Sequence, residues 1–172
     1  MISHQIQDAF NDQLNAELYS AYLYLSMSAY FESMNLKGFA NWMRTQAQEE
    51  MLHAMKFYSF INDRGGRVVL SAIDGPPVKW DSPLGAFEDA YRHEQKVTGL
   101  INNLVDLAID EKDHSAGAFL QWFVTEQVEE EASADAVVQK LKLAGGQGAA
   151  LFMIDAELAT RVFTMPTAQA AE

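Results

Sequence analysis

Cysteine is absent from the 172 residues of this chain. Without it the chain has no disulfide, no thiolate ligand for zinc or an iron–sulfur cluster, and no cysteine nucleophile. Any metal ion must therefore be bound by oxygen and imidazole. No stretch approaches about 18 uninterrupted apolar residues, and the first residues have neither a basic flank nor an apolar run. We therefore expect a soluble protein of the reducing cytoplasm, with no membrane partner.

Basic residues are scarce: 12 Lys and Arg stand against 24 Asp and Glu, which leaves a formal net charge of −12. A surface of this sign repels phosphate backbones and anionic membranes and attracts cations. Nucleic acid is therefore not expected as a partner, and metal ions are favoured. Hydrophobic residues make up 49% of the chain, which is too many for a disordered chain and enough for the core of one domain over residues 1–172.

Proline is also rare, and its four occurrences, at positions 76, 77, 83 and 166, lie at the breaks between long segments. Within four of these segments, apolar residues recur every three or four positions, the period of one helix face. The segments are about 3–34, 37–64, 83–108 and 114–144. A shorter amphipathic segment follows at about 148–163, before a loose tail at 166–172.

This pattern predicts an all-α protein, a four-helix bundle at about 3–144 with a short fifth helix after it. Residues 67–81 are too irregular for a helix and long enough to cross the length of the bundle. Such a long crossover between the second and third helices makes those two helices parallel.

Each of the four helical stripes is interrupted near its midpoint by a carboxylate. The four are Glu17, Glu50, Glu94 and Glu130, and the second stripe also carries His53. An unpaired buried carboxylate costs several kcal/mol, and no Lys or Arg interrupts the stripes, so two divalent cations are the favoured counter-ions. Oxygen ligands with one imidazole suit iron or manganese and also admit zinc.

One alternative is that these are ordinary surface glutamates on helices whose apolar stripe is displaced by one residue. A single glutamate would favour this alternative, because Glu is rarely buried without a partner. Four glutamates at one level of a bundle, one of them followed by a histidine at i+3, favour a metal site. The run from Glu126 to Glu131 has its own alternative, a solvated helix face.

Four motifs carry a family resemblance over nearly the whole chain. They are LNAELYSAYLY at 14–24, AQEEMLH at 47–53, YRHEQ at 91–95 and FLQWFVTEQVEEE at 119–131. In these motifs the sequence resembles the ferritins, specifically the non-haem bacterial ferritins. The resemblance implies a ferritin-like fold for the whole of residues 1–172.

The same resemblance implies which residues bind iron. It assigns a first iron to Glu17, Glu50 and His53, with Glu50 bridging to a second iron at Glu94 and Glu130. It places Gln127 beside the second iron and Tyr24 next to the dinuclear centre. A third iron site is implied at Glu49, Glu126 and Glu129. Bacterioferritins carry a second ExxH motif where this chain has Gln127 and Glu130, so the two irons should have unequal ligand sets.

The function implied by the resemblance is iron storage with ferroxidase activity. Fe(II) would be oxidised to Fe(III) at the di-iron centre by dioxygen or hydrogen peroxide and stored as ferric mineral. A lone bundle cannot enclose a mineral, and the family forms cages of twenty-four subunits in the cytoplasm. Met51 matches the haem-binding position of bacterioferritins, but it also occurs in haem-free relatives, so we interpret it as packing between subunits and expect no haem.

Two other functions remain alternatives. One is a di-iron redox enzyme of the ferritin-like superfamily, such as a rubrerythrin-like peroxidase or an oxygenase, although the rubredoxin module of rubrerythrin needs cysteine. The other is a structural cage without oxidase activity, which should lack Glu17, Glu50 or His53. Outside the stripes, His4, His93 and His114 are expected to be exposed. Trp122 is interpreted as a packing residue, and its place one turn from Glu126 leaves shielding of the centre as an alternative role.

Overall fold

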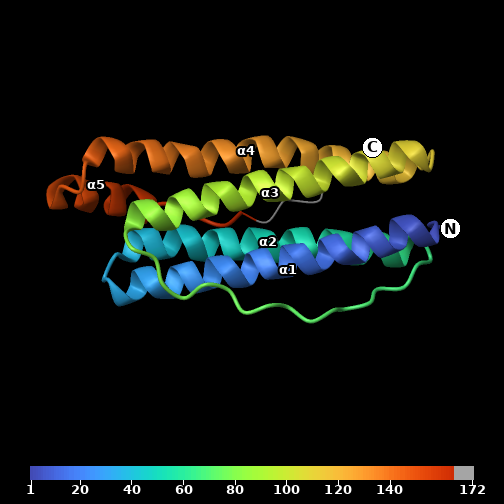
Figure 1. The fold of residues 1–172 in the computed structure, drawn as a ribbon, viewed down its shortest axis with the longest axis horizontal. Helices are drawn as coiled ribbons and strands as arrows, with labels where there is room; N and C mark the ends of the chain where they lie inside the picture. Colours follow the sequence, from blue (N-terminus) through green and yellow to red (C-terminus); the bar gives the residue numbers. More distant parts are fainter. Residues whose placement is uncertain (165–172) are drawn as a thin grey trace.

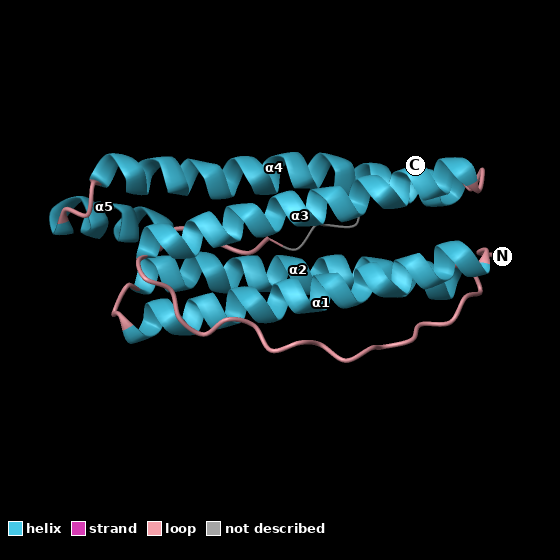
Figure 2. Cartoon of the chain, in the orientation of Figure 1, coloured by secondary structure: helices cyan, strands magenta, loops and turns pink. Residues whose placement is uncertain are grey.

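The computed structural model describes residues 1–164, which form five helices and no strand. The helices are α1 (His4–Ser33), α2 (Lys37–Asp63), α3 (Pro83–Asp110), α4 (His114–Ala144) and α5 (Gly148–Leu158). The predicted all-α fold is confirmed (Figure 2). The predicted loose tail, 166–172, lies outside the described residues. Among residues 1–164, none of the helices has the length and apolar character needed to cross a membrane.

The four long helices form two antiparallel pairs joined by one long connection (Figure 1). The most extensive packing is that of α1 on α2 and of α3 on α4, and α1 also packs on α3. Residues 64–82 run along the whole bundle, so that α2 and α3 are parallel, as predicted. The short α5 lies at one end of the bundle, against α2 and α4.

Local sequence signals determine where the helices begin and end. Ser3, Ser82 and Asp113 each accept a hydrogen bond from the backbone N–H three residues later, at the starts of α1, α3 and α4. Pro83 follows Ser82 at the first helical position, where its missing N–H costs nothing. Gly145 ends α4 with φ +56°, a left-handed conformation that glycine adopts without strain.

The core consists of two apolar clusters separated by a polar layer. One cluster, which includes Phe31 and Phe87, lies toward the end of the bundle where α5 packs, and the other, which includes Phe10 and Phe57, lies toward the opposite end. Between them every long helix contributes buried polar side chains, among them Glu17, Ser20, Gln46, Glu50, His53, Glu94, Gln127 and Glu130. The predicted interruption of each apolar stripe is therefore a single layer across the middle of the bundle.

The fifth helix is shorter than the predicted 148–163 and ends at Leu158. A side chain of α2 binds the carbonyl groups at and just beyond the end of α5. Asn41 Nδ2 donates to the carbonyl oxygens of Leu158 at 3.3 Å and of Arg161 at 2.9 Å. Such a tertiary contact leaves no periodic signal in the sequence of the helix that it ends, so the apolar pattern alone predicted too long a helix.

Candidate metal centre

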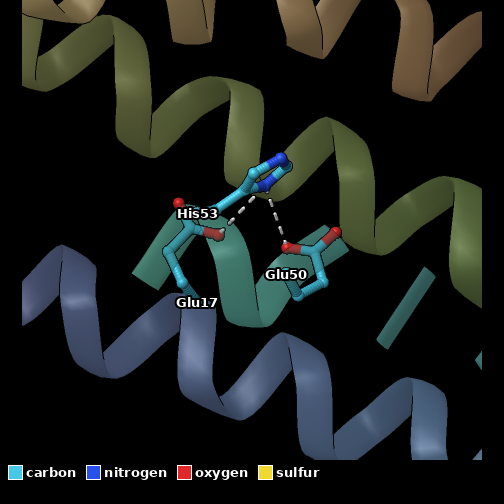
Figure 3. A group of neighbouring side chains, drawn as sticks. All are labelled: Glu17, Glu50 and His53. Carbon is cyan, nitrogen blue, oxygen red and sulfur yellow. Dashed lines mark ion pairs between the residues drawn. The ribbon is translucent and has the colours of Figure 1, made fainter. Parts of the chain in front are cut away.

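Glu17 from α1 and Glu50 and His53 from α2 form one compact group in the polar layer (Figure 3). His53 Nδ1 lies 3.5 Å from Glu50 Oε2 and 4.0 Å from Glu17 Oε2. All three side chains are 1–2% exposed. Glu50 and His53 meet because residues at i and i+3 share a helix face. One potential ligand atom from each residue lies within 4.8 Å of the others, close enough for one metal ion to contact all three.

Two glutamines orient these carboxylates, and neither was assigned a role from the sequence. Gln13 Nε2 donates to Glu17 Oε1 at 2.8 Å, and Gln46 Nε2 donates to Glu50 Oε1 at 3.0 Å. Gln46 also donates to Glu130 Oε2 at 2.5 Å, which joins α2 to α4. Within residues 1–164, Glu17 Oε2 has no hydrogen-bond partner. The signal available in sequence was the spacing, since each glutamine precedes its glutamate by one helical turn.

The second half of the layer is formed around Glu94 on α3. The Tyr24 hydroxyl donates to Glu94 Oε1, and Gln127 Nε2 lies 3.3 Å from Glu94 Oε2. Gln127 also donates to Thr98 Oγ1 at 3.3 Å, a second residue that sequence analysis did not assign. Glu94 and Glu130 are both buried. All four helices thus bring a buried carboxylate to the same layer.

Burial is the main cause of the raised pKa values of these carboxyls. It raises the pKa of Glu17 and of Glu130 to about 8 and that of Glu94 to about 7. The pKa of Glu50 is also raised well above its usual value, first by burial and then by the charges of Glu94 and Glu130. In the described chain, His53 is the only basic side chain within 4.0 Å of these four carboxylates. Without metal the layer therefore holds protons that a bound cation would displace.

A second group of possible ligands shares the same histidine. One atom each of His53, Glu126 and Glu130 lies within 4.8 Å of the others. In Figure 3 the second ring nitrogen of His53 points away from Glu17 and Glu50. The imidazole thus lies between two groups of carboxylates.

The residues of the implied third iron site differ in burial and in their partners. Glu126 is half-buried beside His53, whereas Glu129 is exposed. Glu49 forms an ion pair with Arg161, a residue beyond α5. Among the described residues, neither Glu49 nor Glu129 belongs to a group of three possible metal ligands.

Aromatic side chains and a second histidine border the layer. The Trp122 ring lies edge-on to His53, with centroids 5.3 Å apart, the position expected of a shield. The prediction that His93 is exposed was wrong, because it is partly buried with Nε2 2.7 Å from Ser20 Oγ. Burial, aided by the charge of Lys96, lowers the pKa of His93 to about 4, so the ring is neutral at pH 7. His93 directly precedes the buried Glu94 on α3 and faces α1. The apolar stripe used to predict the buried face of α3 did not include this position.

Known proteins resemble this chain in sequence. Residues 7–144 match the ferritin family, described as a ferritin-like domain. The bacterial non-heme ferritin of Bacteroides fragilis is 48% identical over 161 residues, which are 94% of this chain and 100% of that protein. The bacterial non-heme ferritin of Staphylococcus aureus is 39% identical over 163 residues, which are 95% of this chain and 98% of that protein.

Solved structures resemble it in fold. A closed form of Archaeoglobus fulgidus ferritin, engineered by site-directed mutagenesis, matches with a TM-score of 0.94 and 57% identity over 95% of this chain and 100% of that one. A novel open pore ferritin from the same archaeon matches with a TM-score of 0.93 and 56% identity over 94% of this chain and 100% of that one.

Proposed function

This chain belongs to the ferritin family, and from that membership we propose that it stores iron and oxidises Fe(II) to Fe(III) within the bundle. The observation that carries the proposal is the buried polar layer, where four carboxylates and one imidazole meet without a Lys or Arg within ion-pair distance in the described chain. Uncompensated buried carboxylates are costly, and cations remove that cost.

We assign one ferrous ion to Glu17, Glu50 and His53 and a second to Glu94 and Glu130, with Glu50 between them. The two positions differ, because the first has an imidazole and the second has the Gln127 amide beside it. Carboxylate oxygens and imidazole suit iron, and a carboxylate-rich site favours Fe(III) over Fe(II) because it compensates the higher charge. We assign a third ion to Glu49, Glu126 and Glu129, of which Glu126 lies beside His53.

The residues of the layer have separate tasks in the proposed reaction. Glu17 and Glu130 give up their protons as iron binds, because pKa values of about 8 leave them largely protonated near pH 7, and Glu94, with a pKa of about 7, gives up its proton more readily. Gln13 and Gln46 orient carboxylate oxygens, and Tyr24 orients Glu94. Two ferrous ions supply the two electrons that reduce dioxygen to hydrogen peroxide, or hydrogen peroxide to water.

Storage requires an enclosed volume, so we propose that this chain, as one ferritin-like domain over residues 1–172, assembles into a cage of twenty-four copies in the cytoplasm. The net charge of −12 per chain suits such a cage, because acidic surfaces attract ferrous ions. The similar Archaeoglobus structures are described as closed and open pore forms, which supports a shell for this chain as well.

Ferrous salt added in air to the purified protein tests storage. We expect hundreds of iron ions to remain bound to each assembly after gel filtration, with an absorbance typical of ferric mineral. A di-iron redox enzyme would instead saturate at about two ions per chain. Saturation at that level would contradict storage.

Substitutions test the oxidation site separately. Glu50→Ala and His53→Ala should each slow ferrous oxidation by about tenfold or more, because each removes a ligand of the first ion. Glu88→Ala is the matched control, since Glu88 is an α3 glutamate that pairs with Lys142 away from the layer. Rates followed by stopped-flow absorbance should be unchanged in the control. Wild-type rates in both layer variants would contradict the site assignment.

A further inference from the structure

Arg161, three residues beyond the end of α5, reaches back to the edge of the polar layer. Its Nη2 pairs with Glu49 Oε2, and the two side chains are only 21% and 23% exposed. Glu49 is the residue directly before Glu50 in α2. Glu49 also interacts electrostatically with His53 and Glu130, so the guanidinium places a positive charge near the residues assigned to iron.

Several contacts hold this arginine in place. Its guanidinium carbon is 4.3 Å from the centroid of the Trp42 ring, a cation–π contact. Asn41 Nδ2 donates to its backbone carbonyl at 2.9 Å. By contrast, the side chains of the Lys140–Glu157 pair, in the same part of the molecule, are 43% and 55% exposed. The Arg161–Glu49 pair is thus more buried and better anchored than its neighbour.

This pair divides the carboxylates that the family resemblance assigns to a third ion. Glu126 lies with His53 and Glu130, whereas Glu49 is bound to the guanidinium. A metal ion and a guanidinium cannot both bind the same carboxylate oxygen. Two positive charges held beside one carboxylate also repel each other.

We propose that Arg161 is a displaceable counter-ion that occupies Glu49 and keeps a third metal ion from binding tightly. The inference rests on the proposed function, since it presupposes the two iron positions of the layer. The third ion binds with Glu49 only after the guanidinium has left. The residue is a positioning residue, because it acts on the metal through Glu49.

Anaerobic titration of the assembled, metal-free protein with Zn(II) tests the proposal by calorimetry. Zn(II) accepts oxygen and imidazole ligands and undergoes no redox step. Wild-type protein should bind two ions per chain tightly and a third at least about tenfold more weakly. Arg161→Gln, which keeps a polar side chain of similar reach without the charge, should tighten the third step about tenfold and leave the first two unchanged.

Two further variants separate charge from shape and from position. Arg161→Lys keeps the charge, so its third step should remain weak. Lys140→Gln is the matched control, since it removes a cation from the other ion pair near α5 and should leave all three steps unchanged. Circular dichroism and gel filtration establish that each variant is folded and assembled.

Tryptophan fluorescence gives a readout that does not depend on affinity. In a Trp122→Phe background, which removes the indole beside His53, the third Zn(II) should change the emission of Trp42 as the guanidinium leaves its ring. The same addition to a protein that also carries Arg161→Gln should cause no such change.

The outcomes distinguish this inference from the function on which it rests. Two tight ions with an unchanged third step in Arg161→Gln contradict the role of Arg161 alone. A third step that weakens in Arg161→Gln also contradicts it, because the arginine would then support metal binding. Failure of the wild-type protein to bind the first two ions contradicts the proposed function, and this inference with it.

Discussion

At the scale of single residues, the buried pair of Tyr24 and Glu94 joins the apolar core to the polar layer. The tyrosine is fully buried, and burial together with nearby carboxylates raises its pKa well above the usual value. Its hydroxyl therefore stays protonated and donates to Glu94. That hydrogen bond lowers the pKa of Glu94, which burial alone would raise beyond about 7. Tyr24 thus helps Glu94 to be a carboxylate at neutral pH.

Replacement of Tyr24 by Phe should impair the second metal position in a pH-dependent way. Loss of the hydroxyl raises the pKa of Glu94 further, so more of the Glu94 carboxyl is protonated. A cation must displace that proton at pH 6, whereas at pH 8 much of the carboxyl is already ionised. We expect ferrous oxidation to slow about tenfold at pH 6 and much less at pH 8. Initial rates in matched buffers measure this. Tyr19→Phe, beside His93, is the control, and an equal loss at both pH values would disprove the explanation.

The raised pKa values of Glu17 and Glu130 also predict how stability depends on pH. Both carboxyls remain protonated in the folded state up to about pH 8, whereas in the unfolded chain they ionise near pH 4.5. The folded state therefore binds more protons between these values, and the stability of the metal-free protein should fall as pH rises from about 5 to 8. Thermal unfolding at a series of pH values measures the slope.

Bound metal should remove this dependence. A cation replaces the protons of the layer, so the Zn(II)-loaded protein should be more stable than the metal-free one, and most of all at pH 8. Calorimetric titration in buffers of different ionisation enthalpy should detect proton release on binding at pH 6 to 7. Metal-free stability that rises between pH 5 and 8 would show that other groups dominate.

At the scale of helices, α5 and the start of α2 satisfy each other's unpaired backbone groups. The residue before α2, Leu36, offers no side-chain cap. Instead, Asp155 Oδ1 on α5 accepts from the N–H groups of Gly38 at 2.8 Å and Phe39 at 3.1 Å. Gly38 permits this approach, because a Cβ at that position would lie 1.7 Å from the Asp155 carbonyl oxygen. The same contact places the chain beyond α5, including Arg161, beside α2.

Removal of this cap should therefore destabilise the end of the bundle. Asp155→Ala leaves two N–H groups at the start of α2 without their acceptor, at a cost of about 1 kcal/mol. We expect the melting temperature to fall by about 2–4 °C in differential scanning fluorimetry. Glu157→Ala, on the same helix but in an exposed ion pair, should change it far less. Equal effects of the two substitutions would refute the capping role.

At the scale of the whole molecule, α1 and α2 expose a row of large apolar side chains. The row consists of Tyr22, Leu25, Met51, Met55 and Tyr58, each 42–52% exposed. Residues three and four apart share one helix face, so the members on each helix are aligned. Apolar rows of this kind mark contact surfaces between proteins. We therefore expect a second copy of the chain to cover this row in the proposed cage.

A charge in the row should therefore disrupt assembly. Leu25→Glu is expected to release small species from an assembly of twenty-four chains of 19.2 kDa, about 460 kDa in total, because it would bury an unpaired carboxylate. Light scattering after gel filtration measures the mass. Leu25→Met, which conserves volume and polarity, should remain assembled. An intact assembly in the Leu25→Glu variant would exclude this row as an interface.

Much of this architecture could be predicted from the sequence, because helices leave local, periodic signals. The apolar stripes, the glycines at helix ends and the residues before Pro83 give the helix boundaries within a few positions. The same periodicity brought Glu17, Glu50, Glu94 and Glu130 to one buried layer, as predicted. Their identity as iron ligands stays a prediction that the proposed substitutions test.

Contacts between helices that are distant in sequence were not predictable. The hydrogen bond from Gln46 to Glu130, and the burial of His93 against Ser20, depend on how neighbouring helices are rotated about their axes. Periodicity defines a helix face only to within about one residue, since 3.6 residues make a turn. A side chain at the border of a stripe can therefore turn toward either solvent or a neighbouring helix.

The sequence alone determined the all-helical fold, the long crossover and the residues of the central layer, because each depends on local periodicity and on the composition of one helix face. Only the tertiary structure decided that Asn41 ends α5 at Leu158 and that Glu49 forms an ion pair with Arg161. The physical reason is that a residue outside any periodic segment acquires its partner from the packing of the elements around it.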